Sequence, residues 1–205
     1  MTAGLMTASL MSGSLVSGST SASVLSGPEL WFANRGTGFV LLVLLTLSTM
    51  LGVLSTARVS PRIWPRMLSQ GLHRNVSLLA VTFLAAHVVT AVVDTFVDIR
   101  WWNAFVPFSG TYKSLWLGFG SFALDLLIAV TVTSVLRHRM SHRPWRAVHV
   151  MAYAAWGLGL VHGLQMGTDA ATVWGAAINY GCIGVVLVAV FVRLGLLVRP
   201  KLVTA

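Results

Sequence analysis

Five long stretches of mostly apolar, nearly uncharged sequence follow one another along this chain of 205 residues. They lie between Arg35 and Arg58, Arg74 and Asp94, Lys113 and Arg137, Arg146 and Asp169, and Asp169 and Arg193. Each stretch is close to the roughly 20 residues that an α-helix needs to cross about 30 Å of hydrocarbon. The alternating pattern of a membrane β-barrel is absent from the sequence. The sequence therefore predicts an all-α integral membrane protein, a bundle of five transmembrane helices.

The composition agrees with a lipid environment. Hydrophobic residues make up 56% of the chain and charged residues only 9%, far fewer than the roughly 25% of a soluble domain. The net charge of +9 comes from short basic clusters between the apolar stretches, so we expect a lipid bilayer and no nucleic acid as partner. The single cysteine, Cys182, excludes an internal disulfide and a cysteine-ligated metal site within one chain. Any metal must therefore be held by histidine.

The distribution of lysine and arginine predicts the orientation. Basic residues gather in the first loop, the third loop and the C-terminal segment: Arg58, Arg62, Arg66 and Arg74; Arg137, Arg139, Arg143 and Arg146; Arg193, Arg199 and Lys201. In the second loop Arg100 and Lys113 are offset by Asp94 and Asp98, and the fourth loop holds only Asp169. By the positive-inside rule the three basic segments are cytoplasmic. We expect the N-terminus outside and the C-terminus inside a bacterial cytoplasmic membrane.

The two ends of the chain differ in composition from the apolar stretches. Residues 1–30 are mostly Ser, Thr, Gly, Ala, Leu and Met with one charge, Glu29, and they lack the basic start of a signal peptide. We expect a disordered extracytoplasmic segment over 1–30, a transmembrane helical domain over 31–198 and a short cytoplasmic tail over 199–205.

Four histidines lie inside two of the predicted spans. His73 and His87 are 14 residues apart in the second span, and His149 and His162 are 13 apart in the fourth. Both separations correspond to about 20 Å along a helix, so two helices running outward offer two histidine pairs at matched depths. This arrangement is the one required if each of two flat cofactors lies between an imidazole above and an imidazole below. Haem fits, because neutral imidazole is a good axial ligand to iron.

A simpler interpretation stays open for each histidine, because an intramembrane histidine also forms hydrogen bonds between helices. The angular positions of the histidines around their helices do not fully agree with two matched pairs. At 100° per residue, 14 residues return to within about 40° of the starting face, whereas 13 residues end about 140° away. Gly157, Gly159 and Gly163 would permit a local distortion, a close cofactor contact or ordinary helix packing. The sequence does not choose among these.

The segments HRNVSLLAVTFLAAH, residues 73–87, and HVMAYAAWGLGLVH, residues 149–162, resemble the ferric reductase-like transmembrane family. Its relatives include the haem-bearing membrane portion of NADPH oxidases and the membrane subunit of methionine sulfoxide reductase systems. The resemblance covers roughly residues 36–198. It implies two b-type haems, the inner one held by His73 and His149 and the outer one by His87 and His162. Oxidase members of the family have six helices, while five are predicted here.

Several basic residues are candidates for binding the haem propionates. Arg74 follows His73, and Arg143 and Arg146 precede His149, so Arg74 and Arg146 are predicted to contact the inner haem through charge-assisted hydrogen bonds. The alternative, that these arginines only set the topology, stays open. On the outer side Arg100 and Lys113 are expected to be the only basic residues available.

Other residues in and beside the spans have competing interpretations. Asp125 falls in the middle of the third span, where a carboxylate serves either in a proton path or in a hydrogen bond to a neighbouring Ser or Thr. Tyr153 and Trp156 lie between the two histidine levels, where core packing is favoured over electronic coupling of the haems. Trp101 and Trp102 are predicted to be interfacial anchors.

These observations together predict a di-haem cytochrome that forms one component of an oxidoreductase. Electrons enter the inner haem, pass to the outer haem and leave to an extracytoplasmic acceptor. No glycine-rich dinucleotide motif is present in the sequence, so flavin or NAD(P)H is expected only on a partner protein, and the donor is a flavoprotein reductase or a quinone. A second possibility within the redox class is the membrane subunit that reduces a methionine sulfoxide reductase. The alternative from another class is a non-haem scaffold or transport subunit, favoured by the small-residue pattern Gly163 to Gly167 and the abundant tryptophan.

Overall fold

The structure, a computed structural model, describes residues 28–56, 66–94 and 97–202. All the regular structure of these residues is helical: α2 (Pro28–Thr56), α3 (Arg66–Val93), α4 (Trp101–Phe105), α5 (Ser114–Val135), the 3₁₀ helix η1 (Arg137–Arg139), α6 (His142–Met166) and α7 (Val173–Leu202). Helices α2, α3, α5, α6 and α7 are long and apolar enough to cross a membrane, which confirms the predicted all-α fold with five helices of spanning length.

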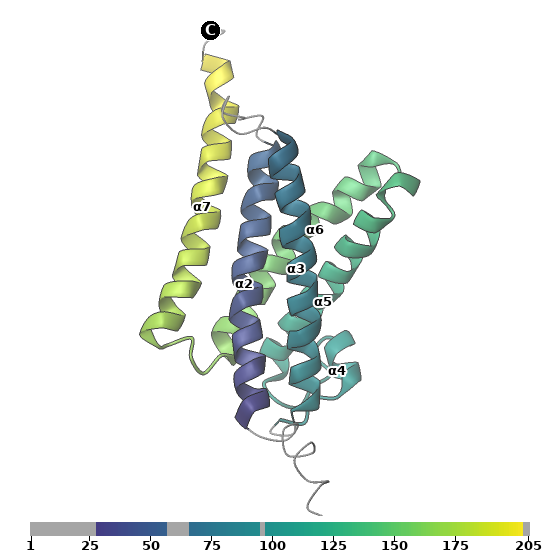
Figure 1. Ribbon diagram of the computed structural model, residues 1–205, viewed down its shortest axis with the longest axis vertical. Coiled ribbons are helices and arrows are strands. Elements are labelled where there is room, and N and C mark those ends of the chain that lie inside the picture. The colour runs from purple at the N-terminus through teal and green to yellow at the C-terminus, as the bar shows by residue number, and fades with distance from the viewer. Residues whose placement is uncertain (1–27, 57–65, 95–96, 203–205) are drawn as a thin grey trace, which may run out of the picture.

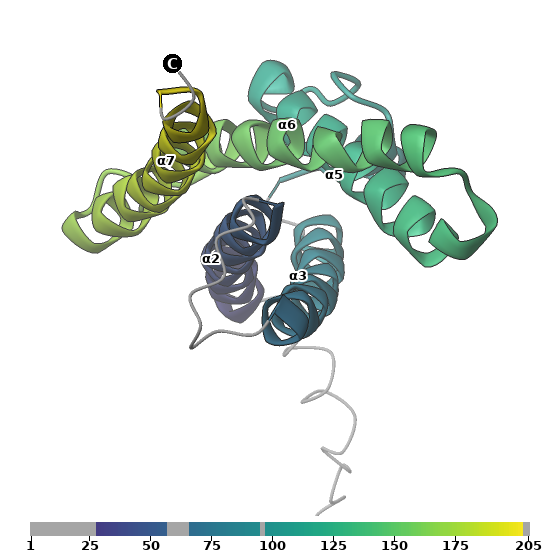
Figure 2. The same cartoon turned by 90° about the horizontal axis from the view of Figure 1, so that it is seen from above.

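Two helical hairpins form the body of the molecule. Helix α2 packs along α3, and α5 packs along α6, while α7 packs against α2 on the outside of the bundle. Viewed from above, α2 and α3 lie side by side and α6 runs across them at an angle (Figure 2). Within the described residues the backbones of α3 and α6 are rarely close to each other. Contacts between these two helices are therefore made by their side chains.

The helix ends segregate by charge. The ends of α2, α5 and α7 and the starts of α3 and α6 lie together at one end of the bundle (Figure 1). We call it the basic end, because it brings together the arginines of η1, of the first turns of α6 and of the second half of α7. The described parts of the three segments that the sequence assigns to one side of the membrane therefore share one end of the fold.

The domain boundaries differ slightly from those predicted. Helix α2 begins at Pro28, so the last three residues of the segment predicted to be disordered are helical, and residues 1–27 lie outside the described residues. Helix α7 continues to Leu202, through much of the predicted tail. Arg58 and Arg62 also lie outside the described residues.

A compact core forms where α2, α6 and α7 meet. Leu42, Leu160 and Cys182 are buried there, and Trp156 packs against them. The indole Nε1 of Trp156 donates a hydrogen bond to Thr46 Oγ1 on α2 at 2.9 Å. Trp156 therefore has the packing role favoured by its sequence position.

The connection between α3 and α5 packs against α5. Phe108 has a positive φ of 64°, and its ring occupies the place where a Cβ on Gly118 would lie. Trp101 and Trp102 on α4 remain 52% and 54% exposed, as expected of side chains that anchor a protein at the membrane–water interface.

Candidate functional site

The four histidines of the spans meet as two pairs between the hairpins. The ring centroids of His73 and His149 lie 6.2 Å apart, and those of His87 and His162 lie 6.4 Å apart. A metal ion that binds two imidazoles on opposite sides holds each nitrogen about 2 Å away, so the ring centres, about 1 Å further out, lie about 6 Å apart. Each pair therefore has the spacing of two ligands on either side of one metal ion.

The two pairs lie at different levels of the bundle. His73 and His149 each come seven residues after the first residue of their helix, so this pair is nearer the basic end, and we call it the inner pair. His87 and His162, the outer pair, lie about 20 Å further along each helix at 1.5 Å per residue. The pairing by level agrees with the arrangement predicted from the spacing.

The inclination of α6 explains why its 13-residue spacing suffices. Helix α6 is unbroken from His142 to Met166, but it lies at an angle to α3 (Figures 1 and 2). The side of an inclined helix that faces its neighbour changes along its length, so residues on different faces meet the same partner at different levels. A Cβ at Gly157, Gly159 or Gly163 would meet nothing within 4 Å, so among the described residues these glycines are not needed for tight packing.

Three of the four imidazoles have a defined tautomer. The Nδ1–H groups of His73, His87 and His162 donate hydrogen bonds to the backbone carbonyls of Ser48, Asn34 and Trp116, at 3.0, 3.0 and 2.9 Å. A carbonyl oxygen only accepts hydrogen bonds, so Nδ1 carries a proton in each ring, and in the neutral imidazole Nε2 keeps its lone pair. A histidine that binds a metal through one nitrogen usually donates its other N–H in this way.

A glycine follows each of these carbonyls four residues later. A Cβ at Gly38 would lie 3.1 Å from Cε1 of His87, one at Gly120 would lie 2.5 Å from Nδ1 of His162, and one at Gly52 would lie 3.6 Å from Cε1 of His73. In an α-helix the residue four positions after a carbonyl flanks that carbonyl oxygen. Glycine at this position leaves room for the imidazole, and we call the carbonyl with its glycine a glycine seat.

In each hairpin one helix carries both histidines, and the glycine seats lie on the other helix. Helix α2 carries the seats for the two histidines of α3, and Gly38 and Gly52 repeat the 14-residue spacing of His73 and His87. Helix α5 carries the seat at Gly120 for His162 of α6. These glycines were not among the residues predicted from the sequence, although the shared 14-residue spacing of Gly38 and Gly52 is visible there.

The position that corresponds to a fourth glycine is a serine. Ser134 lies 14 residues after Gly120 on α5, and its Oγ is 3.4 Å from Nδ1 of His149. The ring of His149 instead stacks on Trp145, with centroids 4.8 Å apart and planes 20° apart. The guanidinium of Arg137 lies 4.4 Å from the centroid of Trp145.

A cavity of about 310 Å³ adjoins the outer pair. It is lined mainly by apolar side chains of α2, α3, α5 and α6, and both His87 and His162 border it. A flat apolar cofactor fits such a slot between helices better than a hydrated ion does. Gly38 and Gly120 also border this cavity.

Arg35 lies near the outer pair, although the sequence indicated it only as the boundary of a span. Its side chain lines the cavity and is 11% exposed, and its Nε lies 2.6 Å from Asp169 Oδ2. It also donates to Thr168 Oγ1 and lies over the ring of Trp31, 4.3 Å from the centroid. Its Nη2 is buried without a hydrogen-bond partner among the described residues, which leaves a buried cationic donor beside the outer pair.

The expectation that Arg100 and Lys113 are the only basic residues available at the outer level is therefore wrong. Arg100 pairs with Asp98 at 3.4 Å on the exposed surface, and Lys113 Nζ donates to the carbonyl of Gln165 at 3.0 Å. Neither residue borders the cavity. The sequence could not show that Arg35 turns into the bundle, because its direction depends on the loop that carries Asp169.

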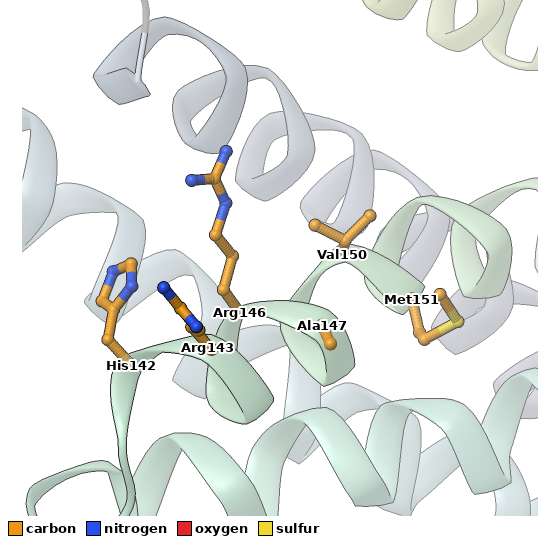
Figure 3. A pocket seen from close by; sticks show the side chains of 6 residues that line it. All are labelled: His142, Arg143, Arg146, Ala147, Val150 and Met151. Atoms are coloured by element: carbon orange, nitrogen blue, oxygen red, sulfur yellow. The ribbon is translucent and has the colours of Figure 1, made fainter.

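The two arginines predicted to contact the inner haem are exposed at the basic end. Arg146 lines an open pocket of about 640 Å³ on the flank of α6, together with His142, Arg143, Ala147, Val150 and Met151 (Figure 3). Arg74 directly follows His73 and borders neither of these two pockets. Contact of Arg74 and Arg146 with haem propionates stays a prediction.

Within the described part of the chain, Asp125 and Tyr153 have no partner that would assign them a role. Asp125 is half-buried on α5 and forms no hydrogen bond or ion pair with another described residue, so one of its two alternatives, a hydrogen bond to a neighbouring Ser or Thr, is not formed there. Tyr153 is 42% exposed, on the surface of the bundle. A proton path through Asp125 stays a prediction.

The number of protein ligands at each level narrows the kind of metal site. No group of three or more His, Cys, Asp or Glu side chains that could hold a metal ion occurs in the described part of the chain. A tetrahedral zinc site needs three or four protein ligands, whereas haem iron brings four equatorial nitrogens and takes only axial ligands from the protein. Two imidazoles at each level therefore fit haem.

Residues 29–169 match the family described as Domain of unknown function (DUF8596). The chain belongs to this family. The matched DUF8596 region runs from α2 to the end of α6, so it contains both hairpins, the four histidines, their seats and the Arg35–Asp169 pair. No curated protein and no solved structure matches the chain.

Proposed function

We propose that this protein is a di-haem b-type cytochrome that passes electrons across a membrane. The observation that carries the proposal is the pair of imidazole couples with ring centroids 6.2 and 6.4 Å apart. Three of these four rings have Nδ1 bonded to a backbone carbonyl and Nε2 left as a ligand. Bound haem supplies one-electron redox chemistry, while the chain supplies axial ligation, spacing and an apolar surrounding.

The outer level offers a partner for an anionic group. The propionates of haem are carboxylates, and the buried Nη2 of Arg35 is without a hydrogen-bond partner among the described residues. A charge-assisted hydrogen bond from Arg35 would satisfy that donor. We infer that Arg35 binds a propionate of the outer haem, and that Asp169 and Trp31 hold the guanidinium in place.

The charge distribution supports the orientation that we propose for the electron path. We place the basic end in the cytoplasm by the positive-inside rule, which puts the inner pair near a cytoplasmic donor and the outer pair near an extracytoplasmic acceptor. The donor is a flavoprotein reductase or a quinone, and flavin or NAD(P)H belongs to that partner. This role resembles that of ferric reductase-like membrane proteins. We place the chain in a bacterial cytoplasmic membrane.

Haem quantitation on the detergent-purified chain tests the proposal. Oxidised and dithionite-reduced spectra with a pyridine haemochrome assay should give two b-type haems per chain. His87→Ala and His149→Ala should each retain about one haem, because each removes one axial ligand from one pair. His138→Ala, which changes an exposed histidine of η1 outside both pairs, is the matched control and should retain both.

A colourless protein after expression with ample haem would overturn the cytochrome proposal. The non-haem scaffold or transport subunit would then be the better account. Equal loss of both haems in His138→Ala would show that the histidine effect is not specific to the pairs.

A further inference from the structure

The inner-pair ligand His149 differs from the other three ligands in how its Nδ1 is held. His73, His87 and His162 each donate to a helix carbonyl that a glycine leaves accessible. Nδ1 of His149 has Ser134 Oγ at 3.4 Å, which is longer than the 2.7–3.2 Å of an ordinary N–H···O hydrogen bond. The fourth ligand therefore lacks the strong acceptor that the others share.

The carbonyl that would complete a fourth seat is that of Val130, four residues before Ser134. Ser134 places a Cβ and a hydroxyl at the position where the other seats have glycine. This side chain occupies the space through which the imidazole of His149 would reach the carbonyl.

Stacking takes the place of the missing hydrogen bond. Trp145, one helical turn before His149, covers the imidazole with nearly parallel planes. Arg137 lies over Trp145 in turn, so a positive charge lies against the ring that stacks on the ligand. The ring is oriented by its face rather than by its Nδ1–H.

A strong hydrogen bond from Nδ1–H makes an imidazole a more basic ligand, which stabilises the oxidised metal and lowers its reduction potential. We propose that Ser134 and Trp145 are positioning residues that make His149 a weaker donor than the other three ligands. The inner haem then has a higher reduction potential than a fourth glycine seat would give it, which favours electron entry at the basic end. This inference rests on the proposed di-haem function.

Redox potentiometry of the full-length holoprotein tests the role of Ser134. The midpoint potential of the inner haem is measured first in the His87→Ala background, where the inner haem is the only one expected. It is measured again in the chain with all four histidines, by fitting two midpoints to the titration. Ser134→Gly should lower this midpoint, because it opens the carbonyl of Val130 to His149. Ser134→Ala keeps the Cβ and should not lower it.

The result that supports the proposal is a midpoint in Ser134→Gly below those of both Ser134→Ala and the unchanged chain. Any other order of the three midpoints overturns it. If the unchanged chain binds no haem, the proposed function fails as well. A chain with two haems and an unshifted midpoint in Ser134→Gly overturns only the inference about Ser134.

An EPR measurement tests the positioning role of Trp145. Trp145→Leu removes the stacked ring and should change the low-spin EPR signal of the inner haem, which depends on the orientation of the axial imidazoles. Trp145→Phe keeps an aromatic face against His149 and should restore the original signal. An unchanged signal in Trp145→Leu would overturn the positioning role of Trp145.

Discussion

At the scale of single residues, the contacts around each imidazole decide which nitrogen is available to a metal. The carbonyls of Asn34, Ser48 and Trp116 take the Nδ1 proton of their histidines, and the glycine four residues later lets the ring approach. The same three glycines would pass for ordinary small residues of membrane helices in the sequence. Their role depends on a ring that comes from another helix.

The seats differ in how much space they leave, which predicts unequal effects of the same substitution. Gly120→Ala would place a Cβ 2.5 Å from Nδ1 of His162, whereas the Cβ of Gly52→Ala would lie 3.6 Å from Cε1 of His73. We expect Gly120→Ala to lose about one haem per chain, because the backbone carbonyl and the ring must separate. Gly52→Ala should keep both, since 3.6 Å is an ordinary van der Waals contact.

The measurement for this pair is the pyridine haemochrome assay together with the yield of folded protein. Retention of two haems in Gly120→Ala would contradict the glycine seat. Loss of haem in both variants would show only that the helices tolerate no added methyl group.

At the scale of helices, one ion pair connects the start of α2 to the loop between α6 and α7. The side chains of Arg35 and Asp169 are 11% and 28% exposed, and removing one partner of a buried pair costs up to about 3–5 kcal/mol. We expect Arg35→Gln to lower the free energy of unfolding by about 1–3 kcal/mol, because this pair is only partly buried. Thermal unfolding in detergent measures the change.

The matched control is Arg100→Gln. Its pair with Asp98 is 58% and 75% exposed, and exposed pairs contribute about 0–1 kcal/mol, so its unfolding temperature should stay close to that of the unchanged chain. Equal shifts in the two variants would refute a specific role for the Arg35–Asp169 pair.

A second contact between helices joins Trp156 on α6 to Thr46 on α2. A neutral hydrogen bond contributes about 0.5–1.5 kcal/mol, so Trp156→Phe and Thr46→Val should both be destabilising. A double-mutant cycle over these two changes should give a coupling of this size. The haem content should not change, because within the described residues neither side chain forms a hydrogen bond or a ring contact with a histidine of the pairs.

Thermal unfolding of the two single variants and the double variant gives the cycle. Additive destabilisation would show that the hydrogen bond contributes nothing, and a loss of haem in Trp156→Phe would argue for a role beyond packing.

At the scale of the whole molecule, the basic end sets the expected orientation in the membrane. The lone cysteine, Cys182, is 6% exposed, so it should react slowly with a membrane-impermeant maleimide. Ala171→Cys, between α6 and α7, should be labelled on intact cells because this loop is predicted to face outward. Ser141→Cys, at the basic end, should be labelled only after permeabilisation.

The unchanged chain serves as the labelling control, since its Cys182 should remain unmodified. Labelling of Ser141→Cys on intact cells, with protection of Ala171→Cys, would show the opposite orientation and reverse the assignment of inner and outer pairs.

Much of this architecture was open to prediction, because the length of an apolar stretch and the position of a residue within it depend only on the order of the amino acids. The five spanning helices and the matching of His73 with His149 and of His87 with His162 follow from that order. The predicted boundaries of the terminal segments were less accurate. Helix α2 begins at Pro28 and α7 runs to Leu202, because apolar and polar residues near an interface both continue a helix.

What the sequence by itself determined is the depth of each side chain along its helix, since the rise per residue is constant. What only the tertiary structure decided is the direction in which each side chain points, because that depends on how the helices cross. The inclination of α6 brings His149 and His162 to the same partner helix despite their register, and the loop after α6 turns Arg35 into the cavity. The difference between Ser134 and the three glycines likewise matters only because an imidazole from another helix lies against each of these positions.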